Sequence, residues 1–180
     1  MIATASQTVG PFFSFGLTTN ESLGHVASSD APGEHLRLRV RILDGNGAPV
    51  PDAVVELWQA NAAGSYDMKS PHFRGFGRLG TDARGGCTFE TVRPGVVPDG
   101  QGGTNAPHIN ICLFMRGLLR HVYTRAYFAG DPLLEQDAVL ALVPEERRDT
   151  LIAHPAPGST AEWTFEVRLQ GESETVFFDL

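Results

Sequence analysis

Residues 35–43 read HLRLRVRIL, and this stretch decides the fold class of the chain. Leucine, valine and isoleucine alternate with arginine, and side chains two residues apart lie on the same face of a β-strand. The pattern therefore predicts a half-buried strand with a charged outer face. The segment 44–47, which reads DGNG, is typical of the turn that ends such a strand.

Short apolar or alternating segments recur along the rest of the chain. They predict further strands at Ala53–Trp58, Cys87–Val92, His108–Arg116, Val122–Phe128, Trp163–Leu169 and Thr175–Asp179. Two short helices are expected at about Pro144–Ala153 and within Asp131–Ala141, the first because proline and two glutamates suit a helix start. Many short strands with few helices indicate an all-β fold, a β-sandwich with long loops and one or two short helices.

The chain divides into an arm and a body. Residues 1–34 are expected to form an N-terminal arm and loop, and residues 35–180 the β-sandwich domain. Gly10-Pro11 is interpreted as a turn beside Phe12 and Phe13. A terminus of this kind frays unless it is tied down, so the two aromatic residues predict docking on the body or on a partner.

Composition excludes several classes of function. The 180 residues are 42% apolar and 19% charged, which suits one globular domain, and no apolar run is long enough to span a membrane. The net charge of −7 argues against binding to nucleic acid. The first residues lack the basic start and apolar core of a signal peptide, so a cytoplasmic location is expected. Cys87 and Cys112 are expected to be free buried thiols.

An incomplete metal-binding motif lies at the start of the strand predicted at 108–116. His108 and Asn110 are two residues apart, where a second histidine would aim two imidazoles at one metal ion. An amide is a poor ligand for a transition metal, so the motif is incomplete.

The segment Gly45–Tyr66 carries a resemblance. With its turn, its strand, Trp58-Gln59-Ala60-Asn61, Gly64 and Tyr66, it resembles the signature of the intradiol ring-cleavage dioxygenases, which open catechols with non-haem ferric iron. Both termini, 6–13 and 170–179, are also similar to that family, so nearly the whole chain is covered. The resemblance implies a β-sandwich of the intradiol dioxygenase type.

The family binds iron through two tyrosines and two histidines, and the resemblance implies where these positions lie here. Tyr66 matches the first tyrosine, and Val97 stands in the place of the second. The histidine positions are His108 and Asn110, and an arginine before them is replaced by Asn105. Since one phenolate and one imidazole cannot hold ferric iron, we expect no metal ion and no catalytic residue in this chain. Tyr66 and His108 are then a packed tyrosine and a satisfied buried histidine in a vestigial site.

The resemblance also implies a partner. Some members pair a chain of this kind with a homologous beta chain that carries the Fe(III), and the iron-free chain lends part of the pocket wall. By residue match this wall would comprise Thr8, Gly10, Pro11 and Arg116, around a catechol-type dihydroxybenzoate and O2. An arginine suits a carboxylate, although Arg116 could instead form an interface salt bridge and the arm could simply pack there. Arg116 is about 26 Å along a strand from His108, so the two cannot serve one small pocket.

Three functions remain open from the sequence. The first is a non-iron subunit that completes the site of the iron-bearing chain. The second keeps this role for another substituted catechol, such as a sulfocatechol, because an arginine binds a sulfonate about as readily. The third is a non-catalytic β-sandwich binding module that needs no partner.

Overall fold

The computed structural model describes residues 3–66 and 69–179. Its strands are β1 (His35–Leu43), β2 (Val54–Gln59), β3 (Phe76–Gly80), β4 (Gly86–Val92), β5 (Val97–Pro98), β6 (Thr104–Asn105), β7 (His108–Phe114), β8 (Val122–Phe128), β9 (Ile152–Pro155) and β10 (Glu162–Arg168). One α-helix, α1 (Pro11–Leu17), and the 3-10 helices η1 (Glu21–Gly24), η2 (Leu134–Gln136), η3 (Leu140–Leu142) and η4 (Glu145–Leu151) complete the regular structure of the described residues.

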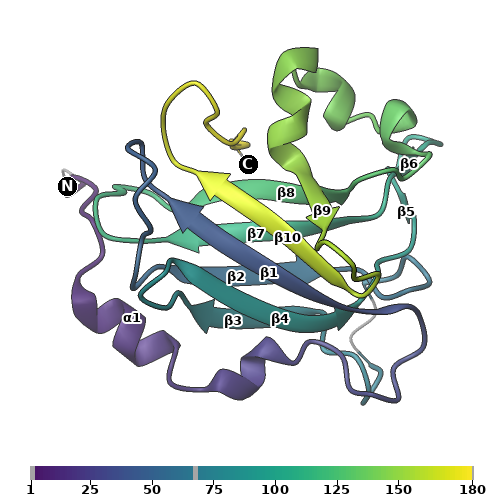
Figure 1. The fold of residues 1–180 in the computed structure, drawn as a ribbon, viewed down its shortest axis with the longest axis horizontal. Helices are drawn as coiled ribbons and strands as arrows, with labels where there is room; N and C mark the ends of the chain where they lie inside the picture. Colours follow the sequence, from purple (N-terminus) through teal and green to yellow (C-terminus); the bar gives the residue numbers. More distant parts are fainter. Residues whose placement is uncertain (1–2, 67–68, 180) are drawn as a thin grey trace.

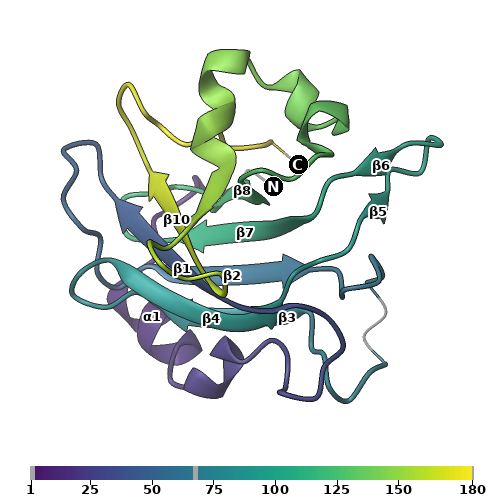
Figure 2. The same cartoon turned by 45° about the vertical axis from the view of Figure 1, so that its right-hand side comes forward.

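The sheet folds over on itself to form two layers (Figure 1). Eight strands run in the order β3-β2-β7-β8-β9-β10-β1-β4, and β5 and β6 form a separate ribbon that projects from the body (Figure 2). The short strand β9 joins the layers, since it pairs in parallel with β8 and antiparallel with β10. The β-sandwich expected from the sequence is therefore confirmed.

The core lies between the two layers, and β1 shows why. Leu36, Leu38, Val40 and Ile42 are buried there, as the alternation in 35–43 predicts. On the outer face, the register sets Arg37 between Glu90 of β4 and Glu162 of β10. Burial of the apolar face drives this strand into place, because each such side chain contributes about 1.5–3 kcal/mol when removed from water.

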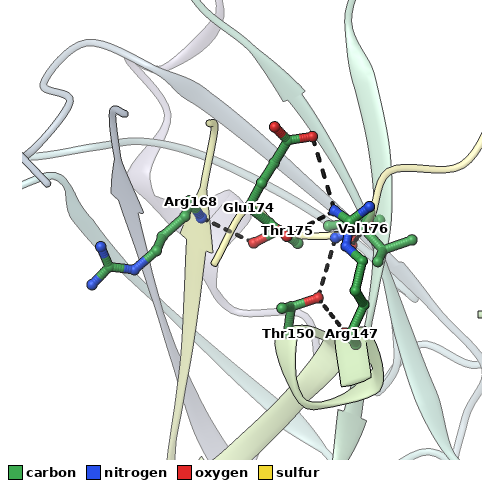
Figure 3. A network of polar contacts seen from close by, with 7 residues as sticks. Arg147, Thr150, Arg168, Glu174, Thr175 and Val176 are labelled. Carbon is green, nitrogen blue, oxygen red and sulfur yellow. Dashed lines mark hydrogen bonds and ion pairs between the residues drawn. The ribbon is translucent and has the colours of Figure 1, made fainter. Parts of the chain in front are cut away.

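A second apolar cluster closes one end of the molecule. Leu140, Val143 and Leu151, from the 3-10 segments, pack with the buried Tyr127 of β8. The segment that follows β10 is fastened beside them by side chains, as Figure 3 shows. Thr150 Oγ1 accepts a hydrogen bond from the Val176 N–H at 3.2 Å, and Thr175 Oγ1 accepts one from the Arg168 N–H at 2.9 Å.

These side-chain bonds explain one wrong prediction. Thr175–Asp179 is not a strand, and only Phe178 forms an isolated bridge, with Tyr123. The Arg147 guanidinium also donates a hydrogen bond to the Glu174 carbonyl oxygen, at 3.0 Å (Figure 3). The N–H groups of Thr175 and Phe178 bond to carbonyl oxygens of β10 and β8, but Val176 between them bonds to the side chains of Thr150 and Thr124, so no continuous strand ladder forms.

The helices also differ from expectation. The segment Pro144–Ala153 is the 3-10 helix η4, which ends at Leu151 because β9 begins at the next residue, and Asp131–Ala141 holds only η2 and the start of η3. Gly10-Pro11 is not a turn: Gly10 is the N-cap of α1 and Pro11 is its first residue. Proline is favoured there because its missing N–H would have no helical partner.

The N-terminal arm docks on the body. The Thr8 hydroxyl accepts a hydrogen bond from the Gly117 N–H at 2.8 Å, and the rings of Phe13 and Phe114 lie 5.4 Å apart. Phe12 points away and is 84% exposed. Within the described ranges, no helix has the length and apolar character needed to cross a membrane.

Candidate functional site

Three neighbouring strands place a row of side chains on the outer face of the sheet. In the register of β2, β7 and β8, Asn110 lies between Trp58 and Arg125. The Asn110 amide nitrogen donates to the Trp58 carbonyl oxygen at 3.3 Å, and its oxygen accepts from the Arg125 Nε at 3.2 Å. The amide that replaces the second histidine of the motif is thus held from both sides.

The loop that carries Tyr66 is shaped by Asn61 and Gly64. The Asn61 side-chain oxygen accepts hydrogen bonds from the N–H groups of residues 63 and 65, at 2.9 and 3.0 Å. Gly64 has a φ of +76°, and a Cβ there would overlap the carbonyl oxygen of Val96. Only glycine combines this backbone conformation with such a close approach, so the loop is pressed against the segment that contains Val97.

Tyr66 is half-buried and has two partners. Its ring stacks on Trp58 with 6.0 Å between ring centroids, and its hydroxyl accepts a hydrogen bond from the Asn110 amide at 3.3 Å. The positions matched to the first tyrosine and the second histidine therefore do meet. They meet through a hydrogen bond between side chains.

Val97 and Asn105 also meet, as register partners in the β5–β6 ribbon. The Val97 side chain has no atom that could bind a metal ion. The Asn105 side-chain oxygen is buried and has no hydrogen-bond partner among the described residues. This pair therefore supplies one neutral amide where the resemblance leads one to expect a phenolate and an arginine.

His108 is buried, 3% exposed, at the start of β7. Its Nδ1 lies 2.7 Å from the Ala106 carbonyl oxygen, which fixes this nitrogen as the donor of the neutral ring. Burial, followed by the charge of Arg125, lowers the pKa of His108 to about 4. The ring also packs against Tyr127, with 5.8 Å between centroids.

A second layer of hydrogen bonds lies behind this row. The Arg125 guanidinium lies 3.4 Å from the Tyr127 hydroxyl, which itself donates to the Asp137 carboxylate at 3.0 Å. Asp137 is fully buried, and it also accepts the N–H groups of residues 106, 139 and 140. Burial raises the pKa of Tyr127, so the phenol stays neutral and can donate.

This donor set does not suit a ferric ion. Val97 offers no ligand atom, and Tyr66 and Asn110 are hydrogen-bonded to each other. The guanidinium of Arg125, a permanent cation, lies 3.2 Å from the Asn110 oxygen and would repel a metal ion there. Ferric iron needs several anionic or imidazole donors to offset its dehydration, and this row provides too few.

The other predicted residues lie at the opposite end of β7. Thr8 touches Gly117, next to Arg116, and Gly10 caps α1 in front of Pro11. Arg116 is largely exposed, and its guanidinium forms an ion pair with Asp52 at 2.8 Å. The structure therefore gathers Thr8 and the neighbourhood of Arg116 at one end, well away from His108 and Asn110.

Arg125, Tyr127 and Asp137 were missed by the sequence interpretation. A usable signal existed for Arg125, because it is a charged residue within the otherwise neutral strand Val122–Phe128 and faces the same way as Tyr127. No comparable signal marks Asp137. It lies on the segment before η3, and only the tertiary fold brings it to Tyr127.

Comparison with known proteins gives a consistent result. The family described as Dioxygenase matches residues 8–171. The chain is 42% identical over 194 residues to the protocatechuate 3,4-dioxygenase alpha chain of Pseudomonas putida, which covers 98% of this chain and 96% of that protein. It is 41% identical over 196 residues to the alpha chain from Burkholderia cepacia, covering 98% of this chain and 97% of the relative.

Two further similarities are more distant. The protocatechuate 3,4-dioxygenase beta chain of Burkholderia cepacia is 36% identical over 165 residues, which cover 83% of this chain and 70% of that one. Among solved structures, 3-chlorocatechol 1,2-dioxygenase from Rhodococcus opacus superposes with a TM-score of 0.68 at 22% identity, over 92% of this chain and 71% of the other. This last similarity supports the fold.

Proposed function

This chain belongs to the intradiol dioxygenase family, and we propose that it is the non-iron alpha subunit of a protocatechuate 3,4-dioxygenase. One observation carries the proposal: in a chain similar over nearly its whole length to two alpha chains, two of the four expected metal donors are replaced, and the matched Tyr66 is hydrogen-bonded to one of the replacements. Asn110 and Tyr66 share a hydrogen bond, and Val97 has no donor atom.

The proposed assembly pairs this chain with a homologous beta chain that holds the Fe(III). The complex would open protocatechuate between its two hydroxylated carbons, with both atoms of O2 entering 3-carboxy-cis,cis-muconate. That reaction places the protein in the breakdown of aromatic compounds through the β-ketoadipate pathway. The iron would supply the activation of the catechol, and this chain contributes no step of its own to that chemistry. A cytoplasmic location is part of the proposal.

The proposed contribution of this chain is part of the pocket wall. The exposed Arg116 would bind the carboxylate of protocatechuate as a planar, permanently charged donor. The hydrogen bond from Gly117 to Thr8 would hold the arm, with Gly10 and Pro11, beside it. To bind a substrate carboxylate, Arg116 would have to break its ion pair with Asp52. An exposed ion pair of this kind costs little free energy to break.

Expression of the chain with and without a beta chain tests this function. The proposal expects turnover of protocatechuate by the complex and none by the isolated chain. Turnover by the isolated chain, or a complex that never forms, would contradict it. The complex should also prefer protocatechuate to a sulfocatechol.

Arg116→Gln in the complex tests the proposed pocket wall. We expect KM for protocatechuate to rise at least tenfold, because a charged hydrogen bond to the carboxylate is worth about 1.5–3 kcal/mol. The smaller, neutral substrate catechol should be affected much less. Arg120→Gln, which changes an exposed arginine four residues away, is the matched control. An unchanged KM together with a weakened complex would assign Arg116 to the subunit interface.

The alternatives are less favoured. Both alpha-chain relatives are protocatechuate enzymes by name, which disfavours a sulfocatechol. The relatives are named as chains of an enzyme, which disfavours the hypothesis of a free-standing binding module.

A further inference from the structure

A cavity of about 710 Å³ opens over the row formed by Trp58, Asn110 and Arg125. Its floor is the outer face of β2, β7 and β8, and its volume lies within the usual range for small-molecule sites. The side chains around it are largely apolar and aromatic; they include Phe76, Tyr123, Leu142 and Phe178. Trp58 also lines the cavity; it is 40% exposed although its ring stacks on Tyr66.

One wall of the cavity is held firmly, although it belongs to the segment after β10. The Phe178 N–H donates to the Tyr123 carbonyl oxygen at 2.8 Å, and the Thr124 hydroxyl donates to the Val176 carbonyl oxygen at 2.8 Å. The bonds through Thr150 fix the same segment from its other side (Figure 3). The cavity is therefore a preformed feature of the fold.

Arg125 is the unusual group in this cavity. Its guanidinium is half-buried, and its hydrogen bonds go to two neutral groups, the Asn110 amide and the Tyr127 hydroxyl. Arg125 takes part in no ion pair within the described part of the chain. Asp137 is linked to Arg125 only indirectly, because the Tyr127 hydroxyl lies between the guanidinium and the carboxylate.

The acidic residues at the cavity do not neutralise Arg125. Glu56 is committed to Arg78, with oxygen to nitrogen distances of 2.6 and 2.8 Å. Asp179 is exposed and has no ion pair with a described residue. A partly buried cation that lacks a carboxylate partner is costly, and an anion that enters its cavity reduces that cost.

We propose that this cavity binds an aromatic carboxylate without reacting with it. The carboxylate lies on the Arg125 guanidinium, and the ring lies against Trp58 and the apolar wall near Phe178. The Nε and Nη1 atoms of Arg125 already donate to Asn110 and Tyr127, so the carboxylate would bind Nη2 and the second hydrogen of Nη1. Aromatic walls suit a ring of benzoate size. The inference needs neither a partner chain nor catalysis, so it can fail or hold independently of the proposed function.

Isothermal titration of the purified full-length chain with benzoate and benzamide tests this site. The two ligands have nearly the same shape and differ in charge. We expect benzoate to bind at least tenfold more tightly than benzamide, and Arg125→Gln to abolish that preference. Arg120→Gln, which removes a charge outside the cavity, should leave both affinities unchanged. Equal affinities in the unchanged chain, or a folded Arg125→Gln variant that keeps the preference, would overturn the proposal.

A second variant guards against a folding defect in Arg125→Gln. Leu142 lines the cavity and is 82% exposed, so Leu142→Trp can narrow the opening without disturbing the core. We expect this variant to weaken benzoate and benzamide together by at least fivefold. Benzoate should also change the fluorescence of Trp58, because the other tryptophan, Trp163, is buried elsewhere in the core. If Leu142→Trp leaves benzoate binding unchanged, the ligand does not occupy this cavity.

Discussion

At the scale of single residues, Asn110 and Arg125 decide what the proposed vestigial metal position can do. A histidine at position 110 would present a lone pair, whereas the asparagine forms hydrogen bonds to Tyr66 and from Arg125. These bonds satisfy polar groups that would otherwise lose water on burial. The site is therefore a closed set of side-chain contacts, and a metal ion would have to break several of them to enter.

His108 gives a prediction at this scale, because its pKa is lowered to about 4 from an ordinary value of 6.5. The unfolded chain takes up a proton near pH 6.5, whereas the folded chain does so only near pH 4. The contribution of His108 to the free energy of unfolding is therefore fully present above pH 6.5 and is lost as the pH falls toward 4. The loss between pH 7 and 4.5 should be about 2 kcal/mol from this residue.

Urea unfolding of the wild-type chain and His108→Gln at pH 7 and 4.5 measures this effect. The variant should be less stable at pH 7 and should lose about 2 kcal/mol less on acidification. His154→Gln, which changes an exposed histidine, should follow the wild type. Identical pH dependence in wild type and His108→Gln would show that His108 is not held neutral by burial.

The resemblance, together with simple strand geometry, names residues for the proposed metal positions but does not show how they are bonded. Tyr66, Val97, Asn105, His108 and Asn110 could be placed because each matches a motif. The contacts of Arg125 could not be placed in the same way. They depend on the register between β7 and β8, and alternation along one strand does not encode that register.

At the scale of elements, two loops must approach closely to bring Tyr66 beside β7. Gly64 and Gly100 offer a matched pair, with φ values of +76° and +78°. A Cβ at Gly64 would overlap the Val96 carbonyl oxygen, whereas a Cβ at Gly100 meets no heavy atom within 4 Å. The two positions share the left-handed backbone and differ in this close approach.

We predict that Gly100→Ala costs about 1 kcal/mol and Gly64→Ala at least about 2 kcal/mol more. Both substitutions place a Cβ on a left-handed backbone, which costs free energy, but only Gly64→Ala must also push the two loops apart. Denaturant unfolding of the two variants measures the difference. Equal costs would mean that the 94–97 segment yields freely and that the loop contact does not position Tyr66.

The elements also show where sequence reasoning succeeds. β1, β2, β4, β7, β8 and β10 were predicted within two residues at each end, because apolar burial on one or both faces leaves a clear pattern. β3 was missed because Gly77 and Gly80 interrupt its pattern, and β9 because it is only 4 residues long. The helix α1 was missed because Gly-Pro suits a turn and a helix start equally well.

At the scale of the whole molecule, β7 joins the two regions for which a function is proposed. One end carries the proposed vestigial metal positions and the cavity over Arg125, and the other leads to Arg116 and the docked arm. At the arm, Phe12 and Phe15 are 84% and 68% exposed. Exposed aromatic side chains of this kind are enriched at protein interfaces, which fits the proposed contact with a beta chain.

The iron content of each chain tests the central claim most directly. The chain would be purified alone and as a complex with a beta chain, each after exposure to iron and removal of loosely bound metal. Metal analysis and the visible absorption of phenolate-bound Fe(III) would then report the sites. The account predicts about one iron per pair of chains in the complex and none in the isolated chain. One tightly bound iron per isolated chain, with that absorption and with turnover of protocatechuate, would contradict it.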